Sequence, residues 1–392
     1  MNALNPDRAS GRLKRVGVLT THPIQYQVPW FRLLEEDPRV ELEVFFCQIP
    51  DAKAQGDGFG VSFEWDVPLL GGYRHRVLEN RAANPSVTRF SGCNTPEIAG
   101  IVGSGNWDAF IVNGWLVWSC IQLLIACRRY GVPCIARGEV NGLSPRPFWK
   151  HLAHRALFKQ YAAFLSIGSR NAQYLREHGV SANRIWSTPY SVDNDRFPFQ
   201  QRPPYEGRCV SFLFSGKLEN KKRPLDILAA ARLLLEQGLS PQQFEVVFAG
   251  DGELRDAIEA EVALAGLPVR MLGFVNQSRL LEVYANADCL LLPSESGETW
   301  GLVVNEAMAT GLPVIVSNTV GCAMDLVRDG DTGLTFSLGD VSALAQRMSR
   351  IIGEEDRARA MGRHAAETVR EGFSPALVAQ GVVDAVYSLD LR

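Results

Sequence analysis

The sequence predicts an α/β protein made of two doubly wound domains, each built around a parallel sheet. Short apolar runs alternate with stretches of helical periodicity almost throughout the 392 residues, which is the pattern of parallel βαβ units. This length exceeds that of one typical hydrophobic core. A segment rich in proline and polar residues, 189–208, separates two series of such units and has the composition of a linker.

The first series of units predicts an N-terminal domain over residues 13–195, preceded by a flexible tail, 1–12. Apolar runs bounded by turn residues predict five strands, at 15–20, 41–47, 109–114, 133–138 and 163–168. Helical periodicity predicts helices between most of them, at 26–36, 117–130 and 148–162.

The second series predicts a C-terminal domain over residues 196–374, followed by a last helix within 375–392. Its apolar runs predict strands at 210–216, 245–250, 269–274, 289–293 and 313–317. A further helix is expected to begin near Gly301 and to end at Gly311 and Pro313. Ligands of such sheets bind at the carboxyl ends of the strands, so the cleft between two such domains is the expected site.

Composition excludes several classes of protein. A hydrophobic content of 46% and a charged content of 21% are those of an ordinary globular chain, and the formal net charge of −3 argues against general nucleic-acid binding. No run approaches the ~18 uncharged apolar residues of a membrane span, and the first residues lack the apolar core of a signal peptide. We therefore expect a cytoplasmic protein.

Cysteines and histidines predict no cofactor and no metal site. The eight cysteines show no CxxC spacing, and the six histidines form no HExxH pattern. Several cysteines, such as Cys134 and Cys289, fall within apolar strand-like runs, where a reduced thiol behaves as a small hydrophobic group.

Two carboxylates follow one of the predicted strands of the second domain. Glu298 is placed on a loop after the run 289–292, and Glu306 is placed inside the next helix. The amino end of a helix that follows a parallel strand collects backbone N–H groups suited to a phosphate. The two glutamates could then hold sugar hydroxyls, although two solvated side chains would show the same spacing.

A cluster of lysines follows the first strand of the same domain. Gly216 permits a tight turn there, and Lys217, Lys221 and Lys222 come directly after it. Such a group can neutralise a diphosphate, and a solvated basic turn is the alternative. The glycines at 250 and 252 repeat the strand-turn-helix design, but an ordinary turn explains them equally well.

These segments, taken in order, resemble the retaining glycosyltransferases of family 4. The series GKLxxxKR, AGDGELR, LGFV, ADCLLLPS, Glu298-x7-Glu306, EAMATGLPVI and VRDGDTGLTF matches this family densely over about residues 208–350. The resemblance implies the GT-B fold, in which two Rossmann-like domains face each other across a cleft. It also implies a nucleotide-sugar held mainly by the C-terminal domain, an acceptor held mainly by the N-terminal one, and a final helix that crosses back to the latter.

The resemblance also assigns roles to residues of the C-terminal domain. Glu298 should bind hydroxyls of the donor sugar, and Glu306 should bind the ribose hydroxyls. Lys222 matches the family lysine on the diphosphate, while Lys217 stands where arginine is usual, which keeps the charge but loses the bidentate fork. The remaining donor-binding positions are Gly216, Thr299, Trp300, Gly301, Leu302, Phe274 and Val275, with the base contacted by backbone around 273–276.

The N-terminal half departs from the family pattern. HPIQYQVPWF replaces the usual glycine-rich first loop, and it is similar to a subgroup of bacterial members thought to build surface polysaccharides. His22, Gln25 and Tyr26 follow the first strand, so they line the cleft or, alternatively, shape a turn and fill the core. Where many members have a histidine, this chain has Glu139.

Near that position, Arg137, Glu139 and Asn141 face donor or acceptor, or else Arg137 and Glu139 pair with each other. Asp193 and Asp195 superficially resemble a metal-binding DxD motif. They lie in the linker and not at a strand end, so no metal is assigned.

Residues 146–165 form a basic helical stretch that bears apolar side chains such as Trp149 and Leu152. It could lie on an anionic membrane that carries a lipid-linked acceptor. A packed helix with a solvated basic face is the alternative.

The resemblance therefore implies a metal-independent, retaining glycosyltransferase that transfers a sugar from a nucleoside diphosphate, UDP or GDP, to an acceptor hydroxyl. No residue is an obvious covalent nucleophile, and the family precedent is front-face substitution. A dehydrogenase would need a GxGxxG turn after the first strand, which LTTHPIQ lacks. A catalytically silent sugar-nucleotide-binding subunit is the second alternative, although it would be expected to lose Lys222, Glu298 or Glu306.

Overall fold

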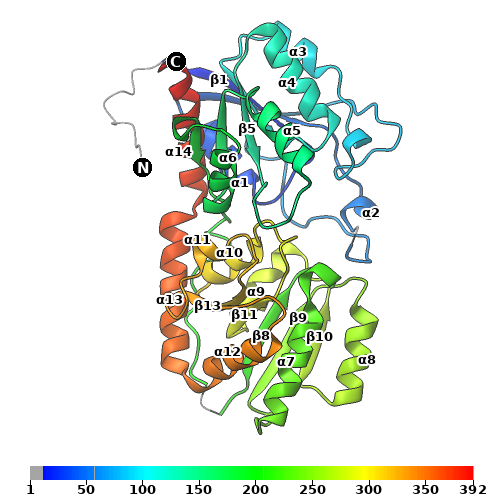
Figure 1. The fold of residues 1–392 in the computed structure, drawn as a ribbon, viewed down its shortest axis with the longest axis vertical. Coiled ribbons are helices and arrows are strands. Elements are labelled where there is room, and N and C mark those ends of the chain that lie inside the picture. Colours follow the sequence, from blue (N-terminus) through cyan, green and yellow to red (C-terminus); the bar gives the residue numbers. More distant parts are fainter. Residues whose placement is uncertain (1–11, 57, 206, 392) are drawn as a thin grey trace. The chain divides into compact units, whose positions relative to one another are not determined.

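The computed structural model describes residues 12–56, 58–205 and 207–391, which form two compact units (Figure 1). The first unit takes in the described residues up to Pro50, Pro68–Tyr190 and the end of the chain from Pro375. The second takes in Asp51–Val67 and Ser191–Ser374. Each unit is a parallel sheet with helices on both faces, which confirms the α/β class and the two Rossmann-like sheets.

The sheet of the first unit has the strand order β3-β2-β1-β4-β5-β6-β7, and all its described pairs are parallel. Its strands are β1 (Lys14–Thr20), β2 (Val40–Phe46), β3 (His75–Val77), β4 (Ala109–Asn113), β5 (Cys134–Gly138), β6 (Ala163–Ser166) and β7 (Ile185–Ser187). The order reverses between β1 and β4, where Val16 lies beside both Leu42 and Ala109. The two connections leave the sheet on opposite faces there, and the carboxyl ends of strands at such a reversal are where ligands of this kind of sheet bind.

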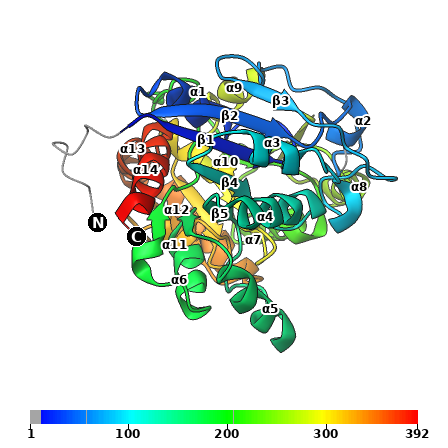
Figure 2. The same ribbon diagram turned by 90° about the horizontal axis from the view of Figure 1, so that it is seen from above.

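Helices cover the two faces of this first sheet. They are α1 (Val28–Glu36), α3 (Ile98–Ser104), α4 (Trp118–Tyr130), α5 (Phe148–Phe158), α6 (Ser169–Glu177) and α14 (Pro375–Tyr387), with short 3-10 turns η2 (Phe90–Gly92), η3 (Ala182–Arg184) and η6 (Ser388–Leu391). Successive residues along the strands point to opposite faces of the sheet and pack into two separate hydrophobic cores. Phe110 packs towards α3 and α4, whereas Ile111 packs towards α1 and α14. Figure 2 shows α4 and α14 over different parts of the sheet.

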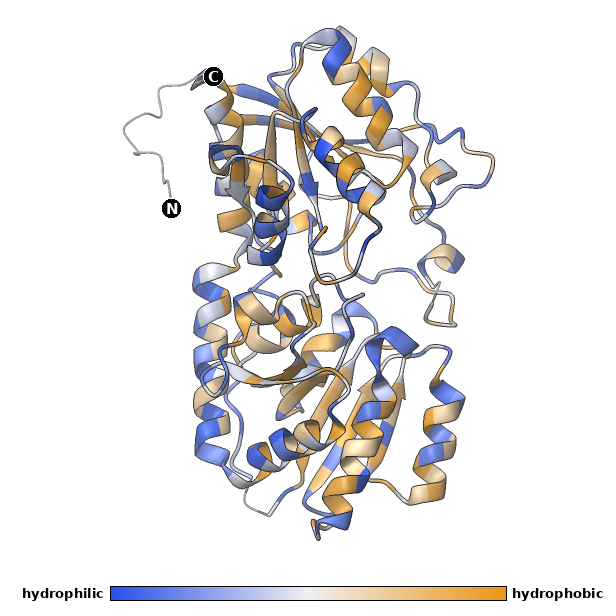
Figure 3. Cartoon of the chain, viewed as in Figure 1, coloured by the Kyte–Doolittle hydropathy of each residue, from blue (hydrophilic) through white to orange (hydrophobic). Residues whose placement is uncertain are grey.

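The second unit has the strand order β10-β9-β8-β11-β12-β13, which reverses between β8 and β11. Its strands are β8 (Val210–Ser215), β9 (Phe244–Ala249), β10 (Val269–Gly273), β11 (Cys289–Leu292), β12 (Val314–Ser317) and β13 (Gly333–Phe336). Every residue of β8, β11 and β12 is buried, as expected for central parallel strands. Figure 3 shows the hydrophobic residues gathered along these strands.

The helices of the second unit follow the strands in alternation. They are α2 (Ala52–Gln55), α7 (Pro224–Glu236), α8 (Arg255–Ala265), α9 (Leu280–Ala285), α10 (Leu302–Ala309), α11 (Ala323–Leu326), α12 (Val341–Gly353) and α13 (Glu355–Gly372), with η4 (Asn220–Lys222) and η5 (Gln277–Arg279). One large core on one face joins α7, α8, α12 and the start of α13 to the sheet.

The strands expected from apolar runs all form, within one or two residues of the expected ends. The helix expected over 148–162 ends at Phe158, because the chain turns there to enter β6. The sequence analysis did not identify β3, β7 and β13. The first two are three residues long and not buried, and β13 begins at a glycine. Such short or glycine-led segments carry little hydrophobic alternation.

Candidate functional site

The turn after β8 lies at the point where the strand order of the second sheet reverses. Gly216 adopts φ +146°, and its N–H donates to the carbonyl of Ala249 at 2.9 Å. A Cβ on Gly250 would lie 1.8 Å from the carbonyl oxygen of Gly216, so only glycine lets the two turns come this close. Lys217 follows directly and is therefore held at the strand tip.

Lys222 and Glu298 form an ion pair between the η4 turn and the loop after β11. Both side chains are largely buried, at 13% and 14% exposure. The backbone N–H of Glu295 donates to the carbonyl of Lys221 at 2.9 Å, and that of Glu298 donates to Glu295 at 2.9 Å. The structure thus brings together two residues that the sequence separates by 76 positions.

The loop that carries Glu298 leads into the amino end of α10. Gly301 precedes the helix with φ +97°, and no side chain caps it. The N–H of Gly321 donates to the Glu298 carbonyl at 3.0 Å, and that of Cys322 donates to the Trp300 carbonyl at 2.9 Å. Thr299 and Leu302 flank this turn and are half-buried. The uncapped amino end of α10 therefore lies beside the Lys222–Glu298 pair, where an anion is favoured.

Glu306 lies inside α10 and is only 8% exposed. Tyr284 donates a hydrogen bond to its Oε2 at 2.6 Å. Burial raises the pKa of the Glu306 carboxyl to about 7, and the Tyr284 hydroxyl and the charge of Arg196 oppose that rise. The sequence analysis missed both partners, because nothing in the sequence links α9 or the linker to α10.

Segment 51–67 packs against the turn after β10. The ring of Phe63 lies 4.1 Å from that of Phe274, and Phe59 lies 5.2 Å from it. Lys217 Nζ lies 5.0 Å from the centre of the Phe59 ring, within cation–π range. The side-chain amide of Asn276 donates to the carbonyl of Glu64 at 2.7 Å. This segment thus covers Phe274 and Lys217, and Val275 beside them is half-buried.

The sequence analysis did not identify segment 51–67 as part of a site. The available signal was the aromatic content of GFGVSFEW, which is unusual for a loop. Aromatic side chains in a loop need a surface to cover, and here that surface is supplied by a residue more than 200 positions away.

In the first unit, the candidate residues follow β1 and β5. Burial lowers the pKa of His22 to about 4, so its imidazole is neutral at pH 7, and Nδ1 lies 2.9 Å from the Thr21 hydroxyl. Tyr26 contacts Tyr190 with its ring, at 4.9 Å, and with its hydroxyl, at 3.3 Å. Gln25 lies between His22 and Tyr26 in the chain and is half-buried.

Tyr190 joins several of these candidates, although no sequence pattern selects it. Its hydroxyl donates to Glu139, and the Arg137 guanidinium lies 4.9 Å from the centre of its ring. Arg137 is 4% exposed, and its Nε has no hydrogen-bond partner among the described residues. Asn141 Oδ1 accepts a hydrogen bond from the backbone N–H of Leu143 at 3.1 Å.

The C-terminal part of the chain matches a known family. Residues 199–368 match the model of the glycosyl transferases group 1. The D-inositol 3-phosphate glycosyltransferase of Nocardia farcinica is 29% identical over 62% of this chain, and the match covers 56% of that relative. The chain thus spans little more than half the length of this curated relative.

Two solved structures share the fold of the whole chain. Sucrose-phosphate synthase from Thermosynechococcus elongatus superposes with a TM-score of 0.73 at 18% identity, over 96% of this chain and 99% of the other. HepE from Anabaena, in complex with UDP, gives 0.72 at 16% identity, over 96% and 100%. These likenesses establish the GT-B fold.

Over residues 199–368 the chain is therefore similar to the group 1 glycosyl transferases. This is glycosyltransferase family 4 of the sequence analysis, and the expected resemblance is supported over that part of the chain.

The family match divides the candidate residues of this chain into two sets. All the donor-side candidates, from Gly216 to Glu306, fall within 199–368. The candidates of the first unit, from His22 to Asn141, fall outside it. The roles of both sets stay predictions, and the second set rests on geometry alone.

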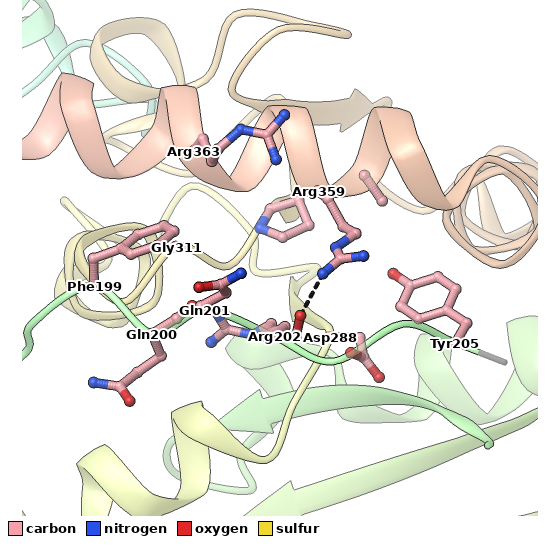
Figure 4. Close-up of a pocket in the computed structure, with 11 residues that line it drawn as sticks. Phe199, Gln200, Gln201, Arg202, Tyr205, Asp288, Gly311, Arg359 and Arg363 are labelled. Atoms are coloured by element: carbon pink, nitrogen blue, oxygen red, sulfur yellow. Dashed lines mark hydrogen bonds between the residues drawn. The ribbon is translucent and has the colours of Figure 1, made fainter. Parts of the chain in front are cut away.

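A cavity of about 310 Å³ lies on the second unit, away from the donor-side candidates (Figure 4). It is lined by the linker, by Asp288, by the end of α10 and by Arg359 and Arg363 of α13. Arg202 donates to the carbonyls of Ala287 and Thr310 at 2.8 Å. Because its donors are used by backbone carbonyls, Arg202 fastens the linker and does not present a charge to a ligand.

Two further findings concern metals and membranes. Among residues 12–56, 58–205 and 207–391, no three His, Cys, Asp or Glu side chains gather closely enough to hold a metal ion. Within the same residues, no helix has the length and apolar character that crossing a membrane requires.

Proposed function

We propose that this chain is a retaining, metal-independent glycosyltransferase that moves a sugar from a nucleoside diphosphate to an acceptor hydroxyl. The observation that carries the proposal is the Lys222–Glu298 pair beside the uncapped amino end of α10, at the strand reversal of the second sheet. A cation and a helix amino end suit a diphosphate, and a carboxylate suits sugar hydroxyls.

In the proposed reaction, the bond between the anomeric carbon and the diphosphate oxygen breaks while the acceptor oxygen bonds to the same carbon. Lys222, Lys217 and the N–H groups near Gly301 stabilise the charge that grows on the leaving diphosphate. A diphosphate oxygen accepts the acceptor's proton, so no protein base is required. Glu298 exchanges Lys222 for sugar hydroxyls when the donor binds, which leaves the lysine to the diphosphate.

Glu306 is proposed to accept hydrogen bonds from the ribose hydroxyls. Its burial and its bond from Tyr284 leave one carboxylate oxygen for a ligand in a site with little water. UDP is the first nucleotide to test, because the fold neighbour HepE was crystallised with it. The sugar and the acceptor follow only at class level: a saccharide, lipid-linked or small-molecule hydroxyl, in polysaccharide, glycolipid or glycosylated-metabolite synthesis.

The HPIQYQVPWF segment supports a place in bacterial surface-polysaccharide synthesis. The residues that would face such an acceptor are His22, Gln25, Tyr26, Arg137 and Glu139. Arg137 is buried, with its Nε lacking a hydrogen-bond partner among the described residues, and its neighbour Glu139 accepts from Tyr190. A buried guanidinium of this kind suits an acceptor that carries anionic or hydroxyl groups.

The decisive experiment is incubation with UDP- and GDP-sugars in the presence of EDTA and a mixture of acceptors. We expect nucleoside diphosphate to be released and the product to keep the anomeric configuration of the donor, as read by NMR. Inversion of configuration would exclude the retaining mechanism, and dependence on an added metal would exclude the metal-independent one. Tight nucleotide binding without turnover on any acceptor would favour a silent binding subunit instead.

A further inference from the structure

Helix α5 of the first unit exposes its large apolar side chains. Phe148 is 75% exposed, Trp149 is 63% exposed and Leu152 is 48% exposed. Phe158 alone among the described residues of α5 is fully buried. At 100° per residue, Phe148, Leu152, Ala156, Trp149 and Ala153 follow one another around one continuous sector of the helix. Figure 2 shows α5 projecting from the sheet.

The opposite face of α5 is fixed by polar contacts to α6. His151 Nδ1 lies 2.8 Å from His178 Nε2, and His154 Nδ1 lies 2.7 Å from the Tyr174 hydroxyl. The rings of Tyr174 and His178 stack at 3.9 Å. These contacts determine which side of α5 faces the protein, so the apolar sector is held outwards by the fold.

The charged residues of α5 and of the chain on either side of it, 140–176, all have one sign. Residues 140–176 contain no Asp or Glu, although the chain as a whole has a net charge of −3. Within α5 and its flanks the cations are Arg146, Lys150, Arg155 and Lys159. Lys150 and Arg155 border the apolar sector, and Lys150 Nζ lies 5.5 Å from the centre of the Trp149 ring. Positive charge is therefore concentrated at a helix that exposes three large apolar side chains.

We propose that α5 docks this protein on an anionic lipid surface, with Phe148, Trp149 and Leu152 inserted among the acyl chains and the flanking cations at the head groups. An apolar sector bordered by Lys and Arg is what an interfacial helix requires. Anionic head groups complement the cations. A second copy of this chain fits less well, because a symmetric contact would bring the same cations together.

This inference does not rest on the proposed function, because lipid binding is measured without any transfer reaction. If both hold, the acceptor is a molecule anchored in the same membrane. The docked protein would then meet the acceptor by diffusion along the membrane surface and not through solution, which raises the effective concentration of the acceptor.

The test is co-sedimentation with vesicles of phosphatidylcholine, with and without phosphatidylglycerol. We expect the protein to sediment with the anionic vesicles and to stay in the supernatant with the neutral ones. Trp149→Ser combined with Leu152→Ser should weaken binding at least about tenfold, given ~25 cal/mol per Å² of apolar surface. Lys150→Glu combined with Arg155→Glu should weaken binding at low salt, and the difference from the original protein should shrink as salt is added.

Matched controls are Leu264→Ser on α8, which removes an exposed apolar side chain elsewhere, and Arg363→Glu on α13, which reverses an exposed charge. Both should bind vesicles as the original protein does. Each α5 variant should stay folded because its changes lie on the exposed face. Circular dichroism and thermal unfolding check this.

Three results would overturn the proposal. They are a failure of the original protein to sediment with either kind of vesicle, equal binding by the α5 variants, and dissociation of a dimer by Trp149→Ser in sedimentation velocity. The last result would assign the surface to a second copy. If the proposal holds, vesicles with brominated acyl chains should quench the Trp fluorescence of the bound protein, and Trp149→Phe should reduce that quenching.

Discussion

The Lys222–Glu298 ion pair is the most informative contact at the scale of single residues. The two side chains neutralise each other's charge where both are largely buried. In the proposed reaction each of them changes partner, to a diphosphate or to a sugar. Exchange of partners costs less than exposing an unpaired buried charge.

We expect Glu298→Ala to reduce transfer at least about 100-fold, because the sugar loses its carboxylate partner in the transition state. Binding of nucleoside diphosphate should be largely retained, since Lys222 is left to the diphosphate. Steady-state kinetics and calorimetric titration measure the two effects. Glu295→Ala, three residues earlier on the exposed loop, is the matched control, and normal turnover by the Glu298 variant would remove this residue from the mechanism.

Glu306 predicts a pH dependence of nucleotide binding. Burial raises its pKa to about 7, so the carboxyl is mostly protonated at pH 6 and ionised at pH 8. Ribose hydroxyls donate to the ionised form, so affinity should rise with pH through this range, by about tenfold per pH unit below the pKa. The measurement is a calorimetric titration with UDP from pH 5.5 to 8.5, chosen to bracket a pKa of about 7.

Titration of the diphosphate itself contributes to that profile, so two controls isolate the carboxyl group. Glu306→Gln keeps the shape and abolishes ionisation, and a 2′,3′-dideoxy nucleotide removes the hydroxyls. Both should flatten the part of the profile that belongs to Glu306. A profile unchanged by either control would show that this carboxyl does not contact the ribose.

At the scale of elements, the connection from β11 to α10 positions the loop that carries Glu298. Gly301 adopts φ +97° there, and a Cβ would lie 3.0 Å from Leu292 and 3.1 Å from Val320. Both the backbone conformation and the space therefore select glycine. The sequence places a glycine at the start of this helix, but it does not show which side chains crowd it.

Gly301→Ala should lower the free energy of unfolding by about 1–2 kcal/mol and should also reduce transfer, because relief of the strain moves the loop. Gly353→Ala at the end of α12 is the matched control, since a Cβ there meets nothing within 4 Å. Urea unfolding and kinetics of both variants test this. Full activity of a destabilised Gly301 variant would show that the loop tolerates the shift.

At the scale of the whole molecule, the end of the chain completes the core of the first unit. Val378, Val382, Val383 and Val386 of α14 are buried together with Val16 of β1. The sheet that contains the first strand is thus closed by the last helix. The candidate donor site belongs to the second unit, so stability of the one and ligand binding by the other are separable quantities.

Val382→Ala should therefore lower the stability of the first unit by about 2 kcal/mol through lost burial and a cavity. Affinity for nucleoside diphosphate should stay unchanged. Leu377→Ala, at a 41% exposed position of the same helix, should have little effect on either. Calorimetric unfolding with and without UDP distinguishes the units, and a loss of affinity in the Val382 variant would contradict the separation.

The sequence by itself determined the α/β class, ten of the strands and the resemblance to the family. Buried parallel strands are continuous apolar runs, and the turns between them need glycine, so both are local properties of the chain. It also selected Lys222 after one strand, and Glu298 and Glu306 after another, with roles implied by the family resemblance.

Only the tertiary structure decided which residues meet. It paired Tyr284 with Glu306, placed segment 51–67 on Phe274, joined Tyr26 and Glu139 through Tyr190, and turned the apolar side of α5 outwards. Each depends on contacts between segments distant in the chain. Periodicity shows that a helix has two faces, but the partner that packs against one of them determines which face is buried.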